Sequence, residues 1–214
     1  MGRLGGMSMF NCSKCGFHGC SSRNLEKSLD ECPSKNEKVQ SKAMELYKNE
    51  ENLMIANNAA LVEAEGYCKQ TRLEETINFM KKCGYKKIGM AFCVGLQKEA
   101  RDVQNILEYH GFQVSSVLCK NGAYPKSDIG ISQDQTIRNC KDEVMCNPIG
   151  QALLLNEEHT DFNIILGLCV GHDTLAIKYM DAPVTVFAVK DRVTGHNPLA
   201  AVYLSQGYYH DKLY

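Results

Sequence analysis

The sequence predicts an α/β fold with three layers, in which a mainly parallel sheet of about four strands lies between flanking helices. Two observations predict it. After Gly84, short apolar runs bounded by loops alternate with segments of helical period, which is typical of βαβ units. The runs IGMAF, NIILGL and VTVFAV are apolar without alternation, as expected for strands covered on both faces of a parallel sheet.

The elements of this α/β part follow from the same patterns. We expect strands at Lys87–Phe92, Phe112–Leu118, Asn163–Leu168 and Val184–Val189, and helices at about 96–109, 148–158, 173–180 and 198–205. Two helix starts carry a capping sequence, because Asn147 and Asn197 each precede a proline that suits the first helical position.

The chain divides into a Cys-rich metal-binding module (8–35), a helical connector (36–83) and the α/β domain (84–214). The first part has too few large apolar side chains to bury a core alone. In the connector, apolar residues recur at three- and four-residue spacing, which indicates two or three helices with a break near Gly66.

Composition excludes several classes of protein. The 214 residues include 24 basic and 25 acidic side chains without a long basic stripe, so we expect no nucleic-acid partner. No stretch approaches the roughly 18 apolar residues of a membrane span, and the opening residues lack the apolar run of a secretory signal. We therefore expect a cytoplasmic protein with no membrane partner. Eleven cysteines are too few for a disulfide scaffold of this length, and in a reducing cytosol they stay as thiols or bind metal.

Four cysteines near the amino terminus form a candidate metal site. Cys12, Cys15, Cys20 and Cys32 have the spacing C-x2-C-x4-C-x11-C, and Gly16 permits the tight turn that brings two thiolates toward one point. Zinc and iron-sulfur clusters both accept four thiolates, so the metal stays open. The alternatives are a Cys-x-x-Cys redox pair, independent surface thiols, or His18 as a ligand in place of Cys20.

A second group of cysteines lies at predicted strand ends. Cys93 and Cys169 each end a strand and precede Val-Gly and a helix, Cys119 ends a third strand, and Cys146 precedes a helix cap. Because ligands of open parallel sheets bind outside the carboxyl ends of the strands, these cysteines predict a functional site there. The group could hold a second metal or cluster, or could consist of small buried apolar side chains.

Polar residues beside these cysteines extend the candidate site. Cys169 is the best candidate for a nucleophilic thiol, because Gly171 and a helix start follow it, and His172 could act as ligand or general base. Asp173 is favoured as a helix N-cap. Lys190 and Arg192 could hold a carboxylate or phosphate, or could simply be solvated. The remaining cysteines are interpreted as structural: Cys68, Cys83 and Cys140.

Three stretches carry a likeness to a known family: FCVGLQKEA, MCNPIGQALLLNEEHTDFNIILGLCVGHD and APVTVFAVKDRVTGHNPLAAVY. With these and its Cys-rich start, the chain resembles an uncharacterised family of proteins of anaerobic microbes, described as metal-binding and known as a domain of unknown function. The resemblance implies a cytosolic protein with an amino-terminal metal site held by Cys12, Cys15, Cys20 and Cys32. It implies no activity and no role for the strand-end cysteines.

The leading functional hypothesis is a metal-binding, redox-active cytosolic protein. Zinc or an iron-sulfur cluster would occupy the amino-terminal site, and the strand-end cysteines, with a possible second metal or cluster, would meet a small molecule or a redox partner protein. The alternatives are a non-enzymatic, zinc-stabilised module that binds a small molecule or anion, and a thiol enzyme that uses Cys169. Whether the protein is an enzyme stays open, as does its oligomeric state.

Overall fold

A computed structural model describes residues 10–214. Residues 8 and 9 of the Cys-rich module, and nearly all of the opening segment considered for a secretory signal, lie outside this range. The chain forms two compact units, 1–61 and 62–214, whose border falls within a helix.

The first unit is built from short elements. Two 3-10 turns, η1 (Cys12–Lys14) and η2 (Pro33–Lys35), precede the helices α1 (Glu37–Leu46) and α2 (Glu50–Gly66). The Asn36 side chain caps α1 by accepting a hydrogen bond from the Val39 amide at 3.2 Å. Among residues 10–61 only Gly19 is buried, so the described part of this unit has no hydrophobic core.

The second unit contains the α/β fold. Its helices are the end of α2, α3 (Arg72–Lys82), α4 (Gln97–Tyr109), α5 (Pro148–Glu157), α6 (His172–Tyr179), α7 (Leu199–Tyr203) and α8 (His210–Leu213). Its strands are β1 (Lys87–Phe92), β2 (Gln113–Leu118), β3 (Phe162–Leu168) and β4 (Val184–Val189), all parallel in the order β2-β1-β3-β4. The predicted fold class is confirmed, and the predicted strands agree with these bounds to within one residue.

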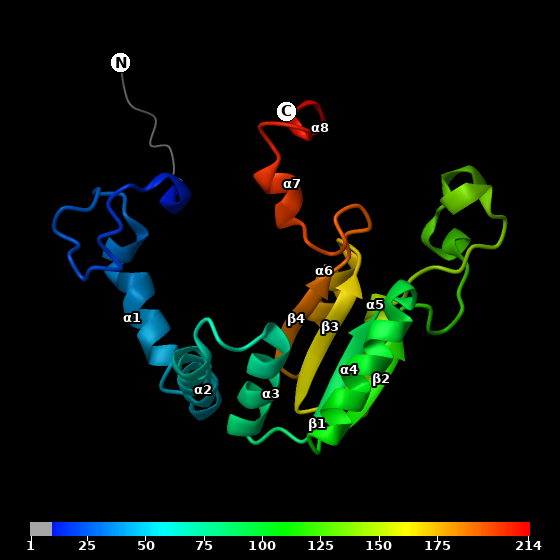
Figure 1. Ribbon diagram of the computed structural model, residues 1–214, viewed down its shortest axis with the longest axis horizontal. Helices are drawn as coiled ribbons and strands as arrows, with labels where there is room; N and C mark the ends of the chain where they lie inside the picture. The colour runs from blue at the N-terminus through cyan, green and yellow to red at the C-terminus, as the bar shows by residue number, and fades with distance from the viewer. Residues whose placement is uncertain (1–9) are drawn as a thin grey trace. The chain divides into compact units, whose positions relative to one another are not determined.

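Helices cover both faces of the sheet (Figure 1). The chain moves from β1 outward to β2, then crosses back over β1 to β3 and continues to β4. Because such crossovers are right-handed, α4 lies on one face and α5 and α6 lie on the other. The strand order reverses between β1 and β3, and in open α/β sheets this reversal is where ligands bind, outside the carboxyl ends of the strands.

The core is centred on the two inner strands. Ile88 and Met90 of β1, and Ile164 and Ile165 of β3, are at most 1% exposed. β4 differs from the prediction, because every residue of this strand is only half-buried. β4 is an edge strand with a single neighbour, and its apolar run did not reveal that position.

Helix starts agree with the sequence in one case and differ in two. Asn147 caps α5, and its side-chain oxygen accepts a hydrogen bond from the Gly150 amide at 2.9 Å. The prediction that Asn197 caps its helix is wrong, because α7 begins at Leu199 with Pro198 in the cap position. Asp173 is not an N-cap either. Gly171, with φ of +83°, takes that position in α6, and the Asp173 carboxylate accepts from the Thr174 amide.

Between β2 and α5 the chain forms a long connection rather than a regular element. It contains the 3-10 turns η4 (Lys126–Ile129), η5 (Gln133–Gln135) and η6 (Ile137–Asn139), and a fourth turn, η3 (Val94–Leu96), follows β1. Within residues 10–214, none of the helices combines the length and apolar character needed to cross a bilayer.

Candidate functional site

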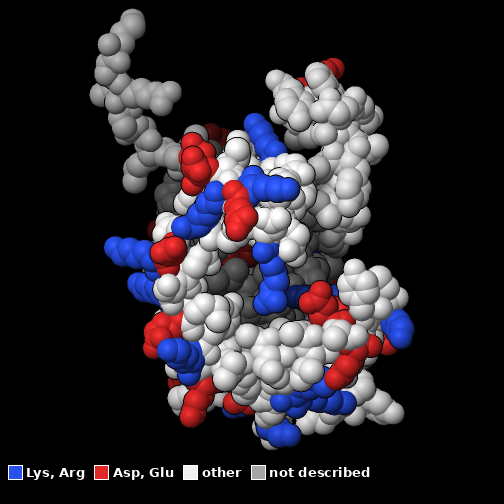
Figure 2. Space-filling view, turned by 90° about the vertical axis from the view of Figure 1, so that its left-hand side faces the viewer, with Lys and Arg blue, Asp and Glu red and all other residues white. Residues whose placement is uncertain are grey.

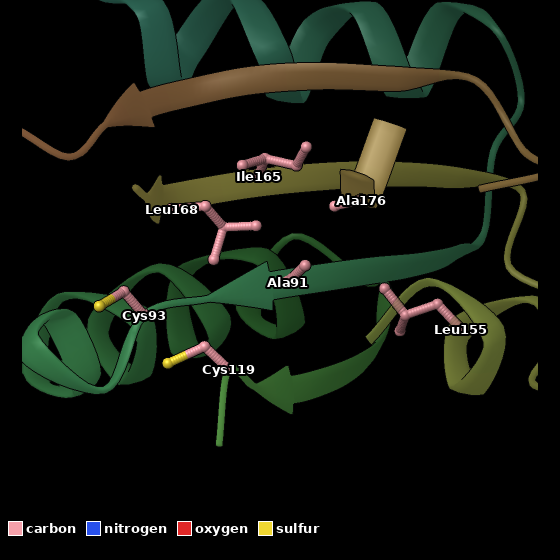
Figure 3. Close-up of a cluster of buried hydrophobic side chains, with 7 residues drawn as sticks. All are labelled: Ala91, Cys93, Cys119, Leu155, Ile165, Leu168 and Ala176. Carbon is pink, nitrogen blue, oxygen red and sulfur yellow. The ribbon is translucent and has the colours of Figure 1, made fainter. Parts of the chain in front are cut away.

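Two buried thiols lie side by side at the carboxyl edge of the sheet. Cys93 follows β1 and Cys119 follows β2, and both sulfur atoms point beyond the strand ends (Figure 3). Cys119 is 2% exposed and Cys93 is 5% exposed. The parallel ladder holds them together, since the Cys119 amide donates to the Phe92 carbonyl at 2.9 Å. The Val94 amide donates to the Cys119 sulfur at 3.3 Å.

A third thiol reaches this edge from the segment before α5. The Asn147 amide donates to the Cys119 carbonyl at 2.7 Å, which places Cys146 beside the end of β2. The Asn121 side chain fastens the same junction by donating to the carbonyls of Leu118 (3.0 Å) and Asn147 (2.9 Å). Cys146 is half-buried and packs against the buried core around Cys93 and Cys119.

The fourth member is an imidazole. His172 is the first residue of α6, and the turn before it needs the left-handed backbone of Gly171. Its ring interacts with the Cys146 thiol. We call this group the thiol cluster: Cys93, Cys119, Cys146 and His172. Its members come from four separate elements and meet at the edge where the strand order reverses.

The groups of the thiol cluster differ widely in pKa. The Cys146 thiol, followed by the Cys93 thiol and by burial, raises the pKa of Cys119 far above its ordinary value. Contact with Cys119 lowers the pKa of Cys93 to about 5 against the opposing effect of burial. Contact with Cys119 and then with His172 lowers the pKa of Cys146 to about 4. Cys146 in turn raises the pKa of His172. A central thiol therefore lies between two thiolates, one of which faces an imidazolium.

Cys169 lies outside this group and contacts a different residue. The Arg192 guanidinium donates to its sulfur at 3.2 Å. The carboxyl end of β3 is irregular, because Gly167 has φ of +70° and the pairing of β3 with β4 shifts register there. Ile165 and Leu168 consequently face the same core cluster although they are three residues apart (Figure 3). This phase change makes the direction of Cys169 unpredictable from strand alternation.

Two residues that the sequence did not single out support the thiol cluster. Lys120 directly follows Cys119, donates to the Val144 carbonyl, and is close enough to stabilise the Cys146 thiolate. Gln151 of α5 is fully buried and donates to the carbonyls of Phe92 (3.1 Å) and Val117 (2.7 Å). It thereby fixes the ends of β1 and β2. In the sequence, only the position of Lys120 directly after Cys119 could have pointed to either residue.

The amino-terminal cysteines are arranged differently. Cys12, Cys15 and Cys32 line one cavity of about 880 Å³ together with Phe17 and Leu29. The backbone amides of His18 and then Phe17 donate to the Cys15 sulfur and lower the pKa of this half-buried thiol. Cys20 is exposed and is absent from the lining of that cavity.

The thiol geometry does not form a closed metal site as it stands. Among residues 10–214, no group of three or more His, Cys, Asp or Glu side chains is placed so that it could hold a metal ion. No disulfide joins cysteines within residues 10–214. Cys68 and Cys140 are exposed and Cys83 is half-buried.

Comparison with known proteins identifies the family. Residues 32–187 match the family described as "Protein of unknown function (DUF1847)". The chain belongs to this family. It is also 51% identical over 175 residues to an uncharacterised protein of Methanocaldococcus jannaschii (MJ0455). The aligned residues make up 82% of this chain and 88% of that protein. No solved structure matches the chain. The whole thiol cluster lies within the family-matched residues, whereas Cys12, Cys15 and Cys20 precede them.

Proposed function

We propose that this protein is a redox-active thiol protein whose reacting group is the thiol cluster. The observation that supports the proposal is the contact of one buried thiol, Cys119, with both Cys93 and Cys146, together with the contact of Cys146 with His172. A half-buried thiolate beside an imidazolium is a nucleophile, and a second thiol in contact with it can resolve the intermediate that it forms. Cys146 thus takes the role expected for Cys169.

The exchange that this arrangement favours uses a disulfide as oxidant. The Cys146 thiolate attacks one sulfur of the disulfide, the S–S bond breaks, and the leaving thiolate takes a proton from the His172 imidazolium. Cys119 then attacks the Cys146 sulfur of the mixed disulfide, a Cys119–Cys146 bond forms, and the second thiol leaves with the Cys119 proton. One disulfide has been reduced to two thiols and the protein dithiol has been oxidised. Two equivalents of thiol reverse the reaction.

The experiment is disulfide mapping under a limiting oxidant. Reduced, anaerobically prepared protein is treated with substoichiometric 2-hydroxyethyl disulfide, alkylated, digested and analysed by mass spectrometry. A Cys119–Cys146 disulfide should form first, and the Cys119→Ser variant should stop at the mixed disulfide on Cys146. The Cys140→Ser variant is the matched control and should behave as wild type. Oxidation spread evenly over exposed thiols such as Cys68 and Cys140 would refute the proposal.

A second role, metal binding by the first unit, is favoured by a separate observation. Three cysteines line one cavity, and two backbone amides point at the Cys15 sulfur, which is the environment that a thiolate ligand needs. This chemistry suits zinc or an iron-sulfur cluster held by Cys12, Cys15, Cys20 and Cys32, provided that Cys20 turns toward the other three. The metal would stabilise a segment that buries no core.

Metal analysis of anaerobically purified protein tests this second role and separates it from the first. The proposal expects metal in wild type and in Cys146→Ser, and its loss in Cys15→Ser and Cys32→Ser. Metal that is instead lost in Cys119→Ser and Cys146→Ser, and kept in Cys15→Ser, would move the metal to the thiol cluster and replace thiol exchange there. If wild type contains no metal, neither the amino-terminal cysteines nor the thiol cluster is a metal site.

The cellular setting is part of the proposal. The described chain, residues 10–214, holds its cysteines without disulfides, which fits a reducing cytosol better than an oxidising compartment. The partner would be a small molecule or a redox protein able to reach half-buried Cys146.

A further inference from the structure

Three basic side chains surround the thiol cluster at the carboxyl edge of the sheet: Lys120, Lys190 and Arg192. Lys120 follows β2, while Lys190 and Arg192 follow β4. Lys190 extends over the turn after β1, where a Cβ added to Gly95 would come within 2.9 Å of its ammonium nitrogen. Arg192 reaches the Cys169 sulfur at 3.2 Å. The cations therefore follow the two edge strands, β2 and β4, and lie at the same carboxyl edge as the thiols.

Within residues 10–214, none of these cations forms a close ion pair with a carboxylate, although Lys120 lies near enough to Glu143 to lower the pKa of that carboxyl. The ion pairs of the described chain involve other lysines, such as Lys126 with Glu143 and Lys87 with Glu158. The two acidic residues nearest in sequence are used locally. Asp191 accepts from the amides of Val193 (2.9 Å) and Thr194 (3.0 Å), and Asp173 accepts from the Thr174 amide. Elsewhere acidic and basic side chains are interspersed, as on the face in Figure 2.

Cations outnumber thiolates at this edge even when two of its thiols are ionised. Three side-chain cations and the His172 imidazolium face the thiolates of Cys93 and Cys146. The electrostatic effects of Lys190 on Cys93, of Lys120 on Cys146 and of Cys93 on Arg192 show that these groups are near one another. Cations without a close carboxylate partner favour an anion from solution.

We infer that the thiol cluster acts on an anionic, low-molecular-weight disulfide, whose carboxylate or phosphate is held by Lys120, Lys190 and Arg192 while its sulfur meets Cys146. This inference rests on the proposed thiol exchange and names its substrate class. Arg192 presents a planar fork suited to either anion, and the two lysines act as point charges. The cations hold the substrate and take no part in the sulfur exchange.

The test compares three disulfides of similar size. Reduced protein reacts with 3,3′-dithiodipropionate (anionic), 2-hydroxyethyl disulfide (neutral) and cystamine (cationic), and the rate of Cys119–Cys146 disulfide formation is measured at low and high salt. The anionic compound should react at least about tenfold faster than the cationic one at low salt, and the ratio should shrink in high salt. Competition by acetate and by inorganic phosphate then distinguishes which anion the site prefers.

Variants separate substrate binding from effects on the thiols themselves. Lys190→Gln and Arg192→Gln should reduce the anionic-to-cationic rate ratio severalfold, whereas a change in thiol reactivity alone would move all three rates together. Lys178→Gln, in the last turn of α6, is the control and should leave the ratio unchanged. Equal rates for the three disulfides, with the Cys119–Cys146 bond still formed, would overturn this inference and leave thiol exchange standing. Failure of all three to oxidise that pair would overturn both.

Discussion

Cys15 and Cys146 both lie in surroundings that favour a thiolate, but the two surroundings are built in different ways. Cys15 is stabilised by amides two and three residues further along its own turn, in a unit whose described residues bury almost nothing. The Cys146 thiolate is stabilised by residues that follow β2 and by the first residue of α6, and its side chain packs on the buried core of the sheet. A local turn can prepare one ligand, whereas only a folded core can hold several thiols against each other. The first arrangement therefore suits metal binding and the second suits exchange between thiols.

The largest expected difference between the two regions is in how packing stabilises them. Ile165 is fully buried in β3, so Ile165→Ala should lower the free energy of unfolding by about 2–5 kcal/mol. Leu29 is 75% exposed, so Leu29→Ala should change it by less than about 0.5 kcal/mol. Urea denaturation followed by circular dichroism measures both. A comparable loss in the two variants would contradict the view that the first unit lacks a core.

Metal removal should affect the first unit and leave the sheet unchanged. If the first unit depends on bound metal, a chelator should raise the rate of proteolysis within residues 12–35 by roughly tenfold or more. Cleavage within residues 87–189 should stay unchanged, since packing alone holds that part. Limited proteolysis with mass spectrometry measures both rates. Faster cleavage of the sheet after chelation would show that the metal supports the second unit instead.

Alkylation should distinguish Cys146 from an ordinary thiol by its pH dependence. With a pKa of about 4, Cys146 is ionised throughout the range from pH 5.5 to pH 8, so its iodoacetamide rate should be nearly flat. A short peptide thiol with a pKa of about 8.5 should instead react roughly tenfold faster for each pH unit in that range. Peptide mapping after short labelling gives the rate at Cys146. A Cys146 rate that climbs with the peptide control would refute the thiolate.

The smallest expected effect is on stability against pH, compared between wild type and Cys146→Ser. The pKa of Cys146 is lower in the folded chain (about 4) than in the unfolded one, so its stabilising contribution is complete above about pH 8.5 and is lost as pH falls toward 4. The pKa of His172 is raised by Cys146, so its contribution is present below about pH 6.5 and is lost as pH rises through the folded value.

The two contributions together give the stability difference a defined shape. The excess in the free energy of unfolding of wild type over Cys146→Ser should grow from about pH 4.5 to pH 6.5, where only the contribution of Cys146 changes. Above that range it should level off, because the loss of the His172 contribution offsets the gain. Urea unfolding at a series of pH values measures this difference. An excess that stays constant between pH 4.5 and pH 6.5 would mean that Cys146 is neutral in the folded protein.

The sequence revealed the sheet more fully than it revealed the site. The uninterrupted apolar runs of β1 and β3 reflect burial on both faces, and this pattern is independent of long-range detail. Strand ends then located the rim cysteines. Their partners could not be predicted from the sequence. The positive φ of Gly167 breaks the side-chain alternation of β3 just before Cys169, which contacts Arg192. Gln151 bonds to backbone carbonyls of β1 and β2, which are far from it in sequence. Of the three predicted helix caps only Asn147 is confirmed, because Gly171 takes the cap position expected for Asp173 and Pro198 takes the one expected for Asn197.

The central claim, that thiols from separate elements share protons at the carboxyl edge of the sheet, has a direct spectroscopic test. Thiolate absorbance near 240 nm is titrated against pH in reduced, metal-free wild type and in Cys146→Ser. We expect the difference between the two proteins to correspond to about one thiolate already at pH 6. A difference that develops only above about pH 8 would show an ordinary, protonated Cys146 and would contradict the account.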